Sequence, residues 1–301
     1  MTEPKSIACI GLGVMGGPVA GHLARAGHRI TAYNRSRERA EKWAALWSQE
    51  GLEVNFAATP SEAAAGAEII ITCVGNDEDL AEVTQGQSGA LQSMGKGALL
   101  IDHTTVSADM ARQLASECDA RGIDCVDAPV SGGEAGAVNG QLAIMCGGSD
   151  TAMARAEPVM RPYAKAIVHV GSAGAGQTAK MANQMCIAGV LGGLSEAVRL
   201  AQASGLDLDK TYEAISGGAA QSWQMDNRWA TMTRDEFDFG FAIDWMRKDL
   251  GYALDEAKRL GLSSPITALV DQFYADVQAA GGNRLDTSAL ITRLPKASIQ
   301  K

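Results

Sequence analysis

The sequence has few of the features that mark a membrane, disulfide-stapled or metal-binding protein. No apolar run reaches the ~18 residues that cross a bilayer, and the uncharged stretch from Ser6 to Leu23 contains five glycines and Pro18, which disfavour a signal helix. The six cysteines form no C-x-x-C pair, and the four histidines include no pair at metal-ligand spacing. We therefore expect no membrane segment, no metal site and buried reduced cysteines. The expected location is the cytoplasm, or an organelle matrix if a presequence was removed.

Positive charge and aromatic side chains are also scarce. Lys and Arg number 26 against 35 Asp and Glu, giving a net charge of −9, and aromatics are 5% of the chain. This balance repels polyanions, so we expect no nucleic-acid or membrane partner. An anionic small substrate would need a local basic site. The 301 residues, 46% of them apolar, are enough for two globular domains.

The first 170 residues alternate short apolar runs with helical patterns, which is typical of a doubly wound α/β (Rossmann) domain with a mostly parallel sheet. The expected strands are Ser6–Ile10, Arg29–Tyr33, Glu68–Cys73, Ala98–Ile101, Ile123–Val126, Leu142–Cys146 and Ala166–Val170. The expected helices are Met15–Ala26, Ser36–Trp47, Ser61–Ala65 and Ser107–Arg121.

The character of the sequence changes after Val170. About thirty residues without proline follow Gly176, with apolar positions from Met181 to Leu200 at helical spacing, so one long interdomain helix is predicted. The remainder is helical in pattern. We expect an α/β domain over residues 1–170 and an all-α domain over residues 171–301.

A G-x-G-x-x-G motif follows the first strand directly and opens a helix. Its residues are Gly11, Leu12, Gly13, Val14, Met15 and Gly16. Such glycines allow a tight turn, close approach of backbone to a pyrophosphate, and close packing of helix on strand. The phosphates bind at the helix N-terminus. The alternative is a glycine-rich turn with nothing bound, but the strand–turn–helix context favours a dinucleotide.

The second strand ends in Asn34, Arg35 and Ser36. An acidic residue that binds the ribose hydroxyls of NAD is usual here, and it would repel a 2′-phosphate. Asn34 removes that repulsion and Arg35 can pair with a phosphate, so NADP is favoured, with NAD possible. A solvated turn with Ser36 capping the next helix is the alternative.

Further strand ends meet at the same edge of the sheet. Val74 and Gly75 follow one strand, and Asp102 to Thr105 follow another; both segments are expected at the cofactor or are plain loops. His103 is interpreted as a polar loop residue rather than a base.

Ser131, Gly132 and Gly133 follow a later strand and offer a hydroxyl and unhindered N–H groups to a carboxylate, or form a simple turn.

Lys180 lies near the start of the long helix, with Asn183 and Gln184 on the same helical face. A buried lysine among amides can have a lowered pKa and exchange a proton. The alternative is an ordinary solvated helix lysine, and Lys248 is open to the same two interpretations.

Four motifs in this order resemble the β-hydroxyacid dehydrogenase family over essentially the whole chain. They are the glycine motif Gly11–Gly16, Asp127–Gly133, Gly174–Gln184 and Lys248–Leu250. The family includes 3-hydroxyisobutyrate dehydrogenase and the tartronate, glyoxylate and succinic semialdehyde reductases.

The resemblance implies a role for each motif. Lys180 is then the catalytic acid/base, and Ser131 with Gly132 and Gly133 holds the substrate carboxylate. Thr105 lies near the nicotinamide and Lys248 near the cofactor. Many members carry Asn where Gln184 stands, so either Asn183 or Gln184 is the working amide. The resemblance also implies that residues 1–170 form the dinucleotide-binding domain, that residues 171–301 form the substrate and dimerisation domain, and that the protein is a homodimer or homotetramer.

These inferences predict an NADP-preferring dehydrogenase of a short β-hydroxy acid, most simply 3-hydroxyisobutyrate. A reductase of glyoxylate, succinic semialdehyde or tartronate semialdehyde is the alternative. An imine reductase is disfavoured because such enzymes generally lack the lysine, and a non-catalytic cofactor-binding module is disfavoured by the intact Lys180 and Ser131.

Overall fold

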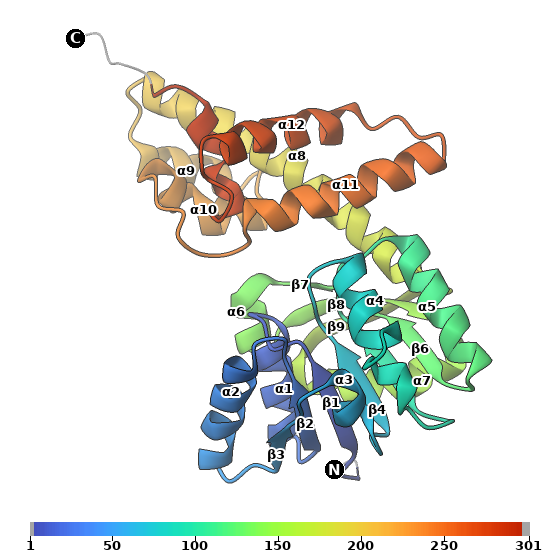
Figure 1. Ribbon diagram of the computed structural model, residues 1–301. Helices are drawn as coiled ribbons and strands as arrows, with labels where there is room; N and C mark the ends of the chain where they lie inside the picture. Colours follow the sequence, from blue (N-terminus) through green and yellow to red (C-terminus); the bar gives the residue numbers. More distant parts are fainter. Residues whose placement is uncertain (1–2, 297–301) are drawn as a thin grey trace. The chain divides into compact units, whose positions relative to one another are not determined.

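The computed structural model describes residues 3–296. The chain divides into two compact units, residues 1–180 and 181–301. The first is a sheet with helices on both faces and the second is helical, as predicted (Figure 1). No helix in the described range is both long and apolar enough to span a bilayer.

The first unit is built on a nine-stranded sheet in the order β3-β2-β1-β4-β5-β6-β8-β7, with β9 also paired to β8. The pairs from β3 to β6 are all parallel, whereas β8 runs antiparallel to β6 and β7. The strands are β1 Ser6–Ile10, β2 Arg29–Tyr33, β3 Val54–Phe56, β4 Ile69–Thr72, β5 Leu99–Asp102, β6 Asp124–Asp127, β7 Val130–Ser131, β8 Leu142–Gly148 and β9 Ala164–Gly171.

The helices of this unit are short and connect successive strands. They are α1 Gly16–Arg25, α2 Arg37–Gln49, α3 Pro60–Ala64, α4 Asp77–Gln85, α5 Ala108–Ala120, α6 Gly133–Val138 and α7 Asp150–Met160, with 3₁₀ turns η1 Ala90–Gln92 and η2 Arg161–Tyr163. The long helix α8 Ala175–Ala203 starts here and continues into the second unit.

Side-chain alternation explains the layers. In β1, Ile7 and Cys9 pack with α1, α2 and α7, while Ala8 and Ile10 pack on the other face with α3. Leu100 of β5 packs with α5. Because successive strand residues point to opposite faces, a continuously apolar strand must be covered on both.

The second unit packs four further helices and a 3₁₀ turn around the remainder of α8. These elements are α9 Leu208–Ser216, α10 Trp223–Thr233, α11 Ile243–Arg259, α12 Pro265–Ala279 and η3 Thr287–Arg293. Leu191 and Val198 of α8 form its core with Trp229 and Tyr274, among others.

One sequence prediction is corrected here. Cys186 is exposed rather than buried, since it lies on the exposed face of α8. Leu200, the last position of the apolar spacing, is also exposed, because at 3.6 residues per turn the buried stripe of α8 passes through Val198 and Ala201.

Candidate active site

The glycine motif forms a turn whose shape depends on missing side chains. Gly11 has a φ of +97°, and a Cβ there would lie 2.2 Å from the Cys73 carbonyl oxygen. A Cβ on Gly16 would lie 2.0 Å from the Gly11 oxygen, so α1 packs directly against the turn. By contrast, within the described chain no atom outside Gly13 and its two chain neighbours lies within 4 Å of a Cβ built on Gly13.

The open side of this turn faces the start of α1. No side chain among residues 3–296 caps this helix start, whose first N–H groups and dipole attract a phosphate. Val14 is exposed and Met15 half-buried beside it. A dinucleotide pyrophosphate therefore fits the space over Gly13.

The end of β2 is tied to the glycine turn. Asn34 Oδ1 accepts a hydrogen bond from the Leu12 N–H at 3.0 Å, and Asn34 Nδ2 donates to the Ser36 oxygen. Arg35 is exposed and its Nη1 lies 2.9 Å from Asp79 Oδ1 on α4. Ser36 occupies the position before α2, but within the described residues its side chain makes no capping bond, contrary to the expectation.

The loops after β4 and β5 are joined side by side. The Val74 N–H donates to Thr104 Oγ1 at 3.1 Å, and Asp102 Oδ1 accepts from Thr72 Oγ1 at 2.7 Å and from the Thr104 N–H at 3.0 Å. Gly75 and Thr105 are half-buried in these loops, whereas Thr104 is fully buried. The structure thus brings both predicted loops to the carboxyl edge of the sheet.

Two buried titratable groups lie at this edge. Burial raises the pKa of Asp102 to about 6, and its Oδ2 has no hydrogen-bond partner in the described part of the chain. Burial also lowers the pKa of His103 to about 4. His103 Nδ1 lies 2.6 Å from the Ala128 oxygen and Nε2 lies 2.9 Å from Tyr163 Oη. A neutral imidazole can donate to the carbonyl and accept from the phenol, so His103 is a structural residue of the interior.

Replacing His103 by Asn is expected to destabilise the protein less at pH 4 than at pH 7.5. The unfolded imidazole titrates near 6.5, whereas the folded one resists protonation until about 4, so this histidine makes the wild type lose stability as pH falls through that window. The difference in unfolding free energy between wild type and variant should shrink by about 3 kcal/mol. Urea titrations at both pH values measure it, and a constant difference would show that the imidazole is not held neutral.

Ser131 ends β7 just before α6. Its neighbours Gly132 and Gly133 have φ values of +137° and +62°, conformations that glycine adopts without strain. Ser131 is half-buried and both glycines are exposed. Ser131, Gly132 and Gly133 therefore lie together in an accessible turn between β7 and α6.

The start of α8 is anchored on the end of β6. Asp127, 4% exposed, accepts from the Gly174 N–H at 2.8 Å and from the Gln177 N–H at 3.0 Å. Burial raises the pKa of Asp127, an effect that these N–H donors partly offset. A Cβ on Gly176 would lie 2.5 Å from the Met145 oxygen, so the helix start contacts the sheet backbone directly.

Lys180 is one turn further along α8 and is 7% exposed, which excludes the solvated-lysine alternative. Asn183 and Gln184 follow at i+3 and i+4 on the same helical face. The Asn183 Nδ2 donates to Gln184 Oε1 at 2.7 Å, and the buried Gln184 donates from Nε2 to Asp249 Oδ2 at 2.7 Å. Gln184 is therefore committed to the second unit's interior, while Asn183 is half-buried.

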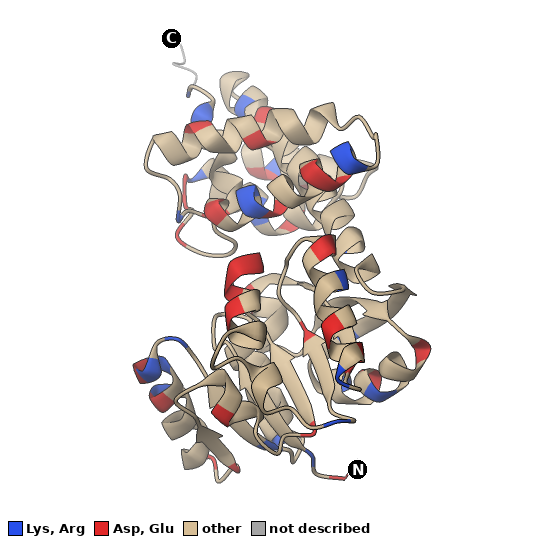
Figure 2. Cartoon of the chain, turned by 45° about the vertical axis from the view of Figure 1, so that its right-hand side comes forward, with Lys and Arg blue, Asp and Glu red and all other residues tan. Residues whose placement is uncertain are grey.

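Lys248 lies on α11, along which charges of both signs alternate (Figure 2). Its Nζ lies 3.3 Å from Asp249 Oδ1 and over the rings of Trp245 and Tyr252, at 5.7 and 5.4 Å from their centres. Asp249 is 2% exposed, and its carboxylate contacts both the Lys248 ammonium and the Gln184 amide.

Sequence reasoning gave no role of their own to Gln177 and Asp249, and it placed Thr104 only within a loop expected at the cofactor. Each acts through a partner that is distant in the sequence, so no local pattern identifies it. The only available signal was position, since Gln177 precedes Lys180 by one helical turn and Asp249 adjoins Lys248.

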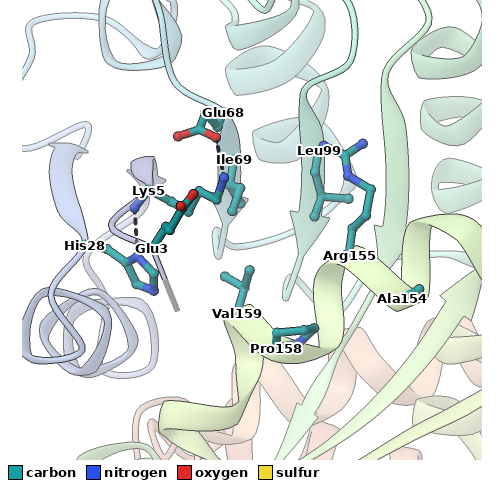
Figure 3. A pocket seen from close by; sticks show the side chains of 10 residues that line it. All are labelled: Glu3, Lys5, His28, Glu68, Ile69, Leu99, Ala154, Arg155, Pro158 and Val159. Atoms are coloured by element: carbon teal, nitrogen blue, oxygen red, sulfur yellow. Dashed lines mark hydrogen bonds and ion pairs between the residues drawn. The ribbon is translucent and has the colours of Figure 1, made fainter. Parts of the chain in front are cut away.

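A pocket of about 370 Å³ lies at the opposite edge of the sheet (Figure 3). Lys5, Ile69 and Leu99 line it at the amino ends of β1, β4 and β5, with Lys5 and Glu68 paired at 2.8 Å. Because dinucleotides bind at the carboxyl ends of such strands, this pocket is not the cofactor site.

Comparison with known proteins gives the same pattern over both units. Residues 6–171 match the family model for the NAD-binding domain of 6-phosphogluconate dehydrogenase. Residues 174–294 match the model described as NAD-binding of NADP-dependent 3-hydroxyisobutyrate dehydrogenase.

Individual relatives extend over nearly the full chain. An uncharacterized oxidoreductase of Shewanella frigidimarina is 52% identical over 97% of this chain and 98% of its own length. The 2-hydroxy-3-oxopropionate reductase of Escherichia coli is 36% identical over 95% of each chain. The solved Mycobacterium tuberculosis 3-hydroxyisobutyrate dehydrogenase with L-serine has a TM-score of 0.86 at 32% identity, covering 97% of this chain and 99% of that one.

Both parts of the chain, residues 6–171 and 174–294, thus match families of nucleotide-dependent dehydrogenases. The chain belongs to the 3-hydroxyisobutyrate dehydrogenase (β-hydroxyacid dehydrogenase) family, whose members are NAD(P)-dependent dehydrogenases acting on CH–OH groups.

Proposed function

We propose that the protein catalyses reversible oxidation of a short β-hydroxy acid, with 3-hydroxyisobutyrate as the type substrate and NADP as the preferred cofactor. One observation carries the proposal: Lys180 is buried, and the turn of α8 that precedes it is hydrogen-bonded to the loop of Thr105. An amine buried at the cofactor-binding edge suits transfer of a substrate proton.

The residues of the chain divide the chemistry between them. The nicotinamide, when bound, supplies the hydride acceptor in oxidation and the donor in reduction. The neutral Lys180 amine takes the proton of the substrate hydroxyl in oxidation, and its ammonium returns that proton to the developing alkoxide in reduction. The Gly11–Gly16 turn holds the pyrophosphate, while Val74, Gly75, Thr105 and Lys248 contribute to the cofactor site.

Substrate binding follows from the donors described above. Ser131 and the N–H groups of Gly132 and Gly133 hold the carboxylate, because their backbone is exposed and unhindered. We assign the orienting amide to Asn183 rather than Gln184, since the Gln184 amide already bonds Asn183 and Asp249.

A second candidate is reduction of a short semialdehyde such as tartronate semialdehyde. The 36% identity to the Escherichia coli 2-hydroxy-3-oxopropionate reductase favours it. The same residues serve this direction, with the Lys180 ammonium as the proton donor.

A panel of initial rates at pH 7 and pH 9 tests the proposal. It pairs NADP and NAD with 3-hydroxyisobutyrate, 3-hydroxypropionate, serine and glycerate, and the reduced cofactors with glyoxylate, succinic semialdehyde and tartronate semialdehyde. Preferred oxidation of one β-hydroxy acid supports the first candidate, and preferred reduction of a semialdehyde supports the second. Cofactor binding without turnover of any of these compounds contradicts both.

Replacing Arg35 by Ala is expected to raise KM for NADP about tenfold and to leave KM for NAD within about twofold. A hydrogen bond to a charged group is worth about 1.5–3 kcal/mol, and 1.4 kcal/mol is tenfold in affinity. The exposed ion pair to Asp79 is worth about 0–1 kcal/mol, so the guanidinium can leave it for a 2′-phosphate.

Two further variants sharpen this experiment. Asp79→Asn removes the competing carboxylate and should lower KM for NADP two- to threefold, by release of the exposed pair. Arg25→Ala, which breaks an exposed pair with Glu50 at the other end of α1, serves as the control. Equal loss of both cofactors in Arg35→Ala would remove Arg35 as the phosphate partner.

A further inference from the structure

We infer that Gln177 is a positioning residue that fixes Lys180 relative to the loop carrying Thr105. The inference rests on the function proposed for Lys180 and Thr105. Gln177 is 0% exposed and precedes Lys180 by three residues on α8. Residues three apart on a helix lie on one face, one turn from each other, so whatever holds Gln177 also holds Lys180.

The Gln177 side chain bonds the backbone on both sides of Thr105. Its Nε2 donates to the Thr104 oxygen at 2.8 Å, and its Oε1 accepts from the Val106 N–H at 3.1 Å. The primary amide supplies a donor and an acceptor on one carbon, which matches a carbonyl and an N–H two residues apart. Thr105 itself is more exposed than either neighbour.

The Thr105 loop is held from its other side as well. Thr104 donates from its N–H to Asp102 and accepts at Oγ1 from Val74. These bonds tie the Thr105 loop to the ends of β4 and β5. A movement of α8 would therefore displace Gln177 relative to this loop.

The start of α8, which carries Gln177, is also held in place. Asp127 accepts from the N–H groups of Gly174 and Gln177, and a Cβ on Gly176 would overlap the Met145 oxygen. A sliding or rotation of the α8 start must break these buried bonds, and an unpaired buried polar group costs about 1–3 kcal/mol. Gln177 thus joins two rigid pieces, the first turns of α8 and the Thr105 loop.

This connection matters to the proposed reaction because proton and hydride leave the same carbinol group. The Lys180 amine must reach the hydroxyl while the carbon faces the nicotinamide beside Thr105. A displacement of about 1 Å between such groups lowers the rate about 10²-fold.

Two variants test the role. Gln177→Met keeps the side-chain length without a donor or acceptor, and Gln177→Glu keeps the shape but places an oxygen against the Thr104 carbonyl. We expect both to lower kcat about 10²-fold, with KM for substrate and Kd for the reduced cofactor within about threefold, by analogy with loss of an interaction made only in the transition state. Thr178→Val is the matched control, since its exposed hydroxyl bonds only to the Gly174 oxygen of its own helix turn.

Amide hydrogen exchange provides a readout that needs neither substrate nor cofactor. In the wild type the Val106 amide should exchange as slowly as the amides of β5, and in both variants it should exchange at least tenfold faster while β1 and β4 keep their protection. Fast exchange of Val106 in the wild type would overturn the inference without any variant. This measurement holds even if one variant folds poorly.

The outcomes separate this inference from the proposed function. An active wild type whose two Gln177 variants keep kcat within threefold overturns the positioning role. A loss expressed in KM with kcat unchanged also overturns it. A wild type inactive with every substrate of the panel shows instead that the proposed function has failed.

Discussion

Replacing Lys180 by Ala is expected to lower kcat about 10³-fold or more, within the range of about 10²–10⁴ that positioned acid–base groups contribute. The lysine is buried on α8 beside two amides, and we assign it the proton transfer in both directions. Its removal leaves the glycine turn and the Arg35 side chain in place, so Kd for NADPH should change less than threefold. Stopped-flow or steady-state absorbance at 340 nm measures kcat, and the fluorescence of NADPH on binding measures its Kd.

A second substitution separates charge from proton transfer. Lys180→Arg keeps the positive charge, but a guanidinium does not release its proton at accessible pH, so oxidation should be lost as fully as in the Ala variant. Lys165→Ala on the exposed strand β9 is the control and should keep full activity. Turnover by Lys180→Ala within tenfold of the wild type would remove Lys180 from the mechanism.

Replacing Gly13 by Ala should weaken NADPH binding about fivefold or more without loss of stability. Within the described residues, no atom outside Gly13 and its two chain neighbours lies within 4 Å of the added methyl group, and the Gly13 backbone is outside the left-handed region. The free protein therefore accommodates Ala, and Gly→Ala at a compatible site stabilises by about 0.4–1 kcal/mol. The methyl group would instead meet the pyrophosphate, and overpacking costs about 1–3 kcal/mol, where 1.4 kcal/mol is a factor of ten.

Alanine substitutions at two other glycines provide comparisons for Gly13→Ala. Gly95→Ala is a control, because its site is equally open and lies in an exposed turn away from the motif. Gly16→Ala should instead destabilise the fold, since its Cβ would lie 2.0 Å from the Gly11 oxygen. Melting curves with and without NADPH distinguish these effects. Normal cofactor binding by Gly13→Ala would place the pyrophosphate elsewhere.

The main elements of the fold could be predicted because their signals are local. Buried parallel strands such as β1 and β4 are short apolar runs next to glycine or aspartate, and α8 has a long apolar periodicity. The elements that were missed carry weak signals. β3 and β7 have three and two residues, α6 has six, and α4 has nine, of which only Leu80 and Thr84 are buried. α7 contains Pro158, a residue that usually ends a helix.

From the sequence we could propose only those site residues whose type and spacing form a local pattern. The glycine turn and Lys180 follow from such patterns, and burial of Lys180 agrees with the interpretation. The supporting bonds of Gln177 and Asp249 span 73 and 65 positions in sequence, and they depend on packing that no local pattern encodes. The bond from Gln184 to Asp249 distinguishes Gln184 from Asn183. Because this bond is long-range, the sequence alone left the two residues as alternatives.

Isotope tracing tests whether hydride passes directly from the carbinol carbon of the substrate to the nicotinamide. The enzyme is given NADP and 3-hydroxyisobutyrate deuterated at the carbinol carbon, and the reduced cofactor is analysed by mass spectrometry and NMR. We expect one deuterium on the nicotinamide ring of NADPH, matched by formation of the semialdehyde. Reduced cofactor without deuterium, or semialdehyde formed without cofactor reduction, would contradict it.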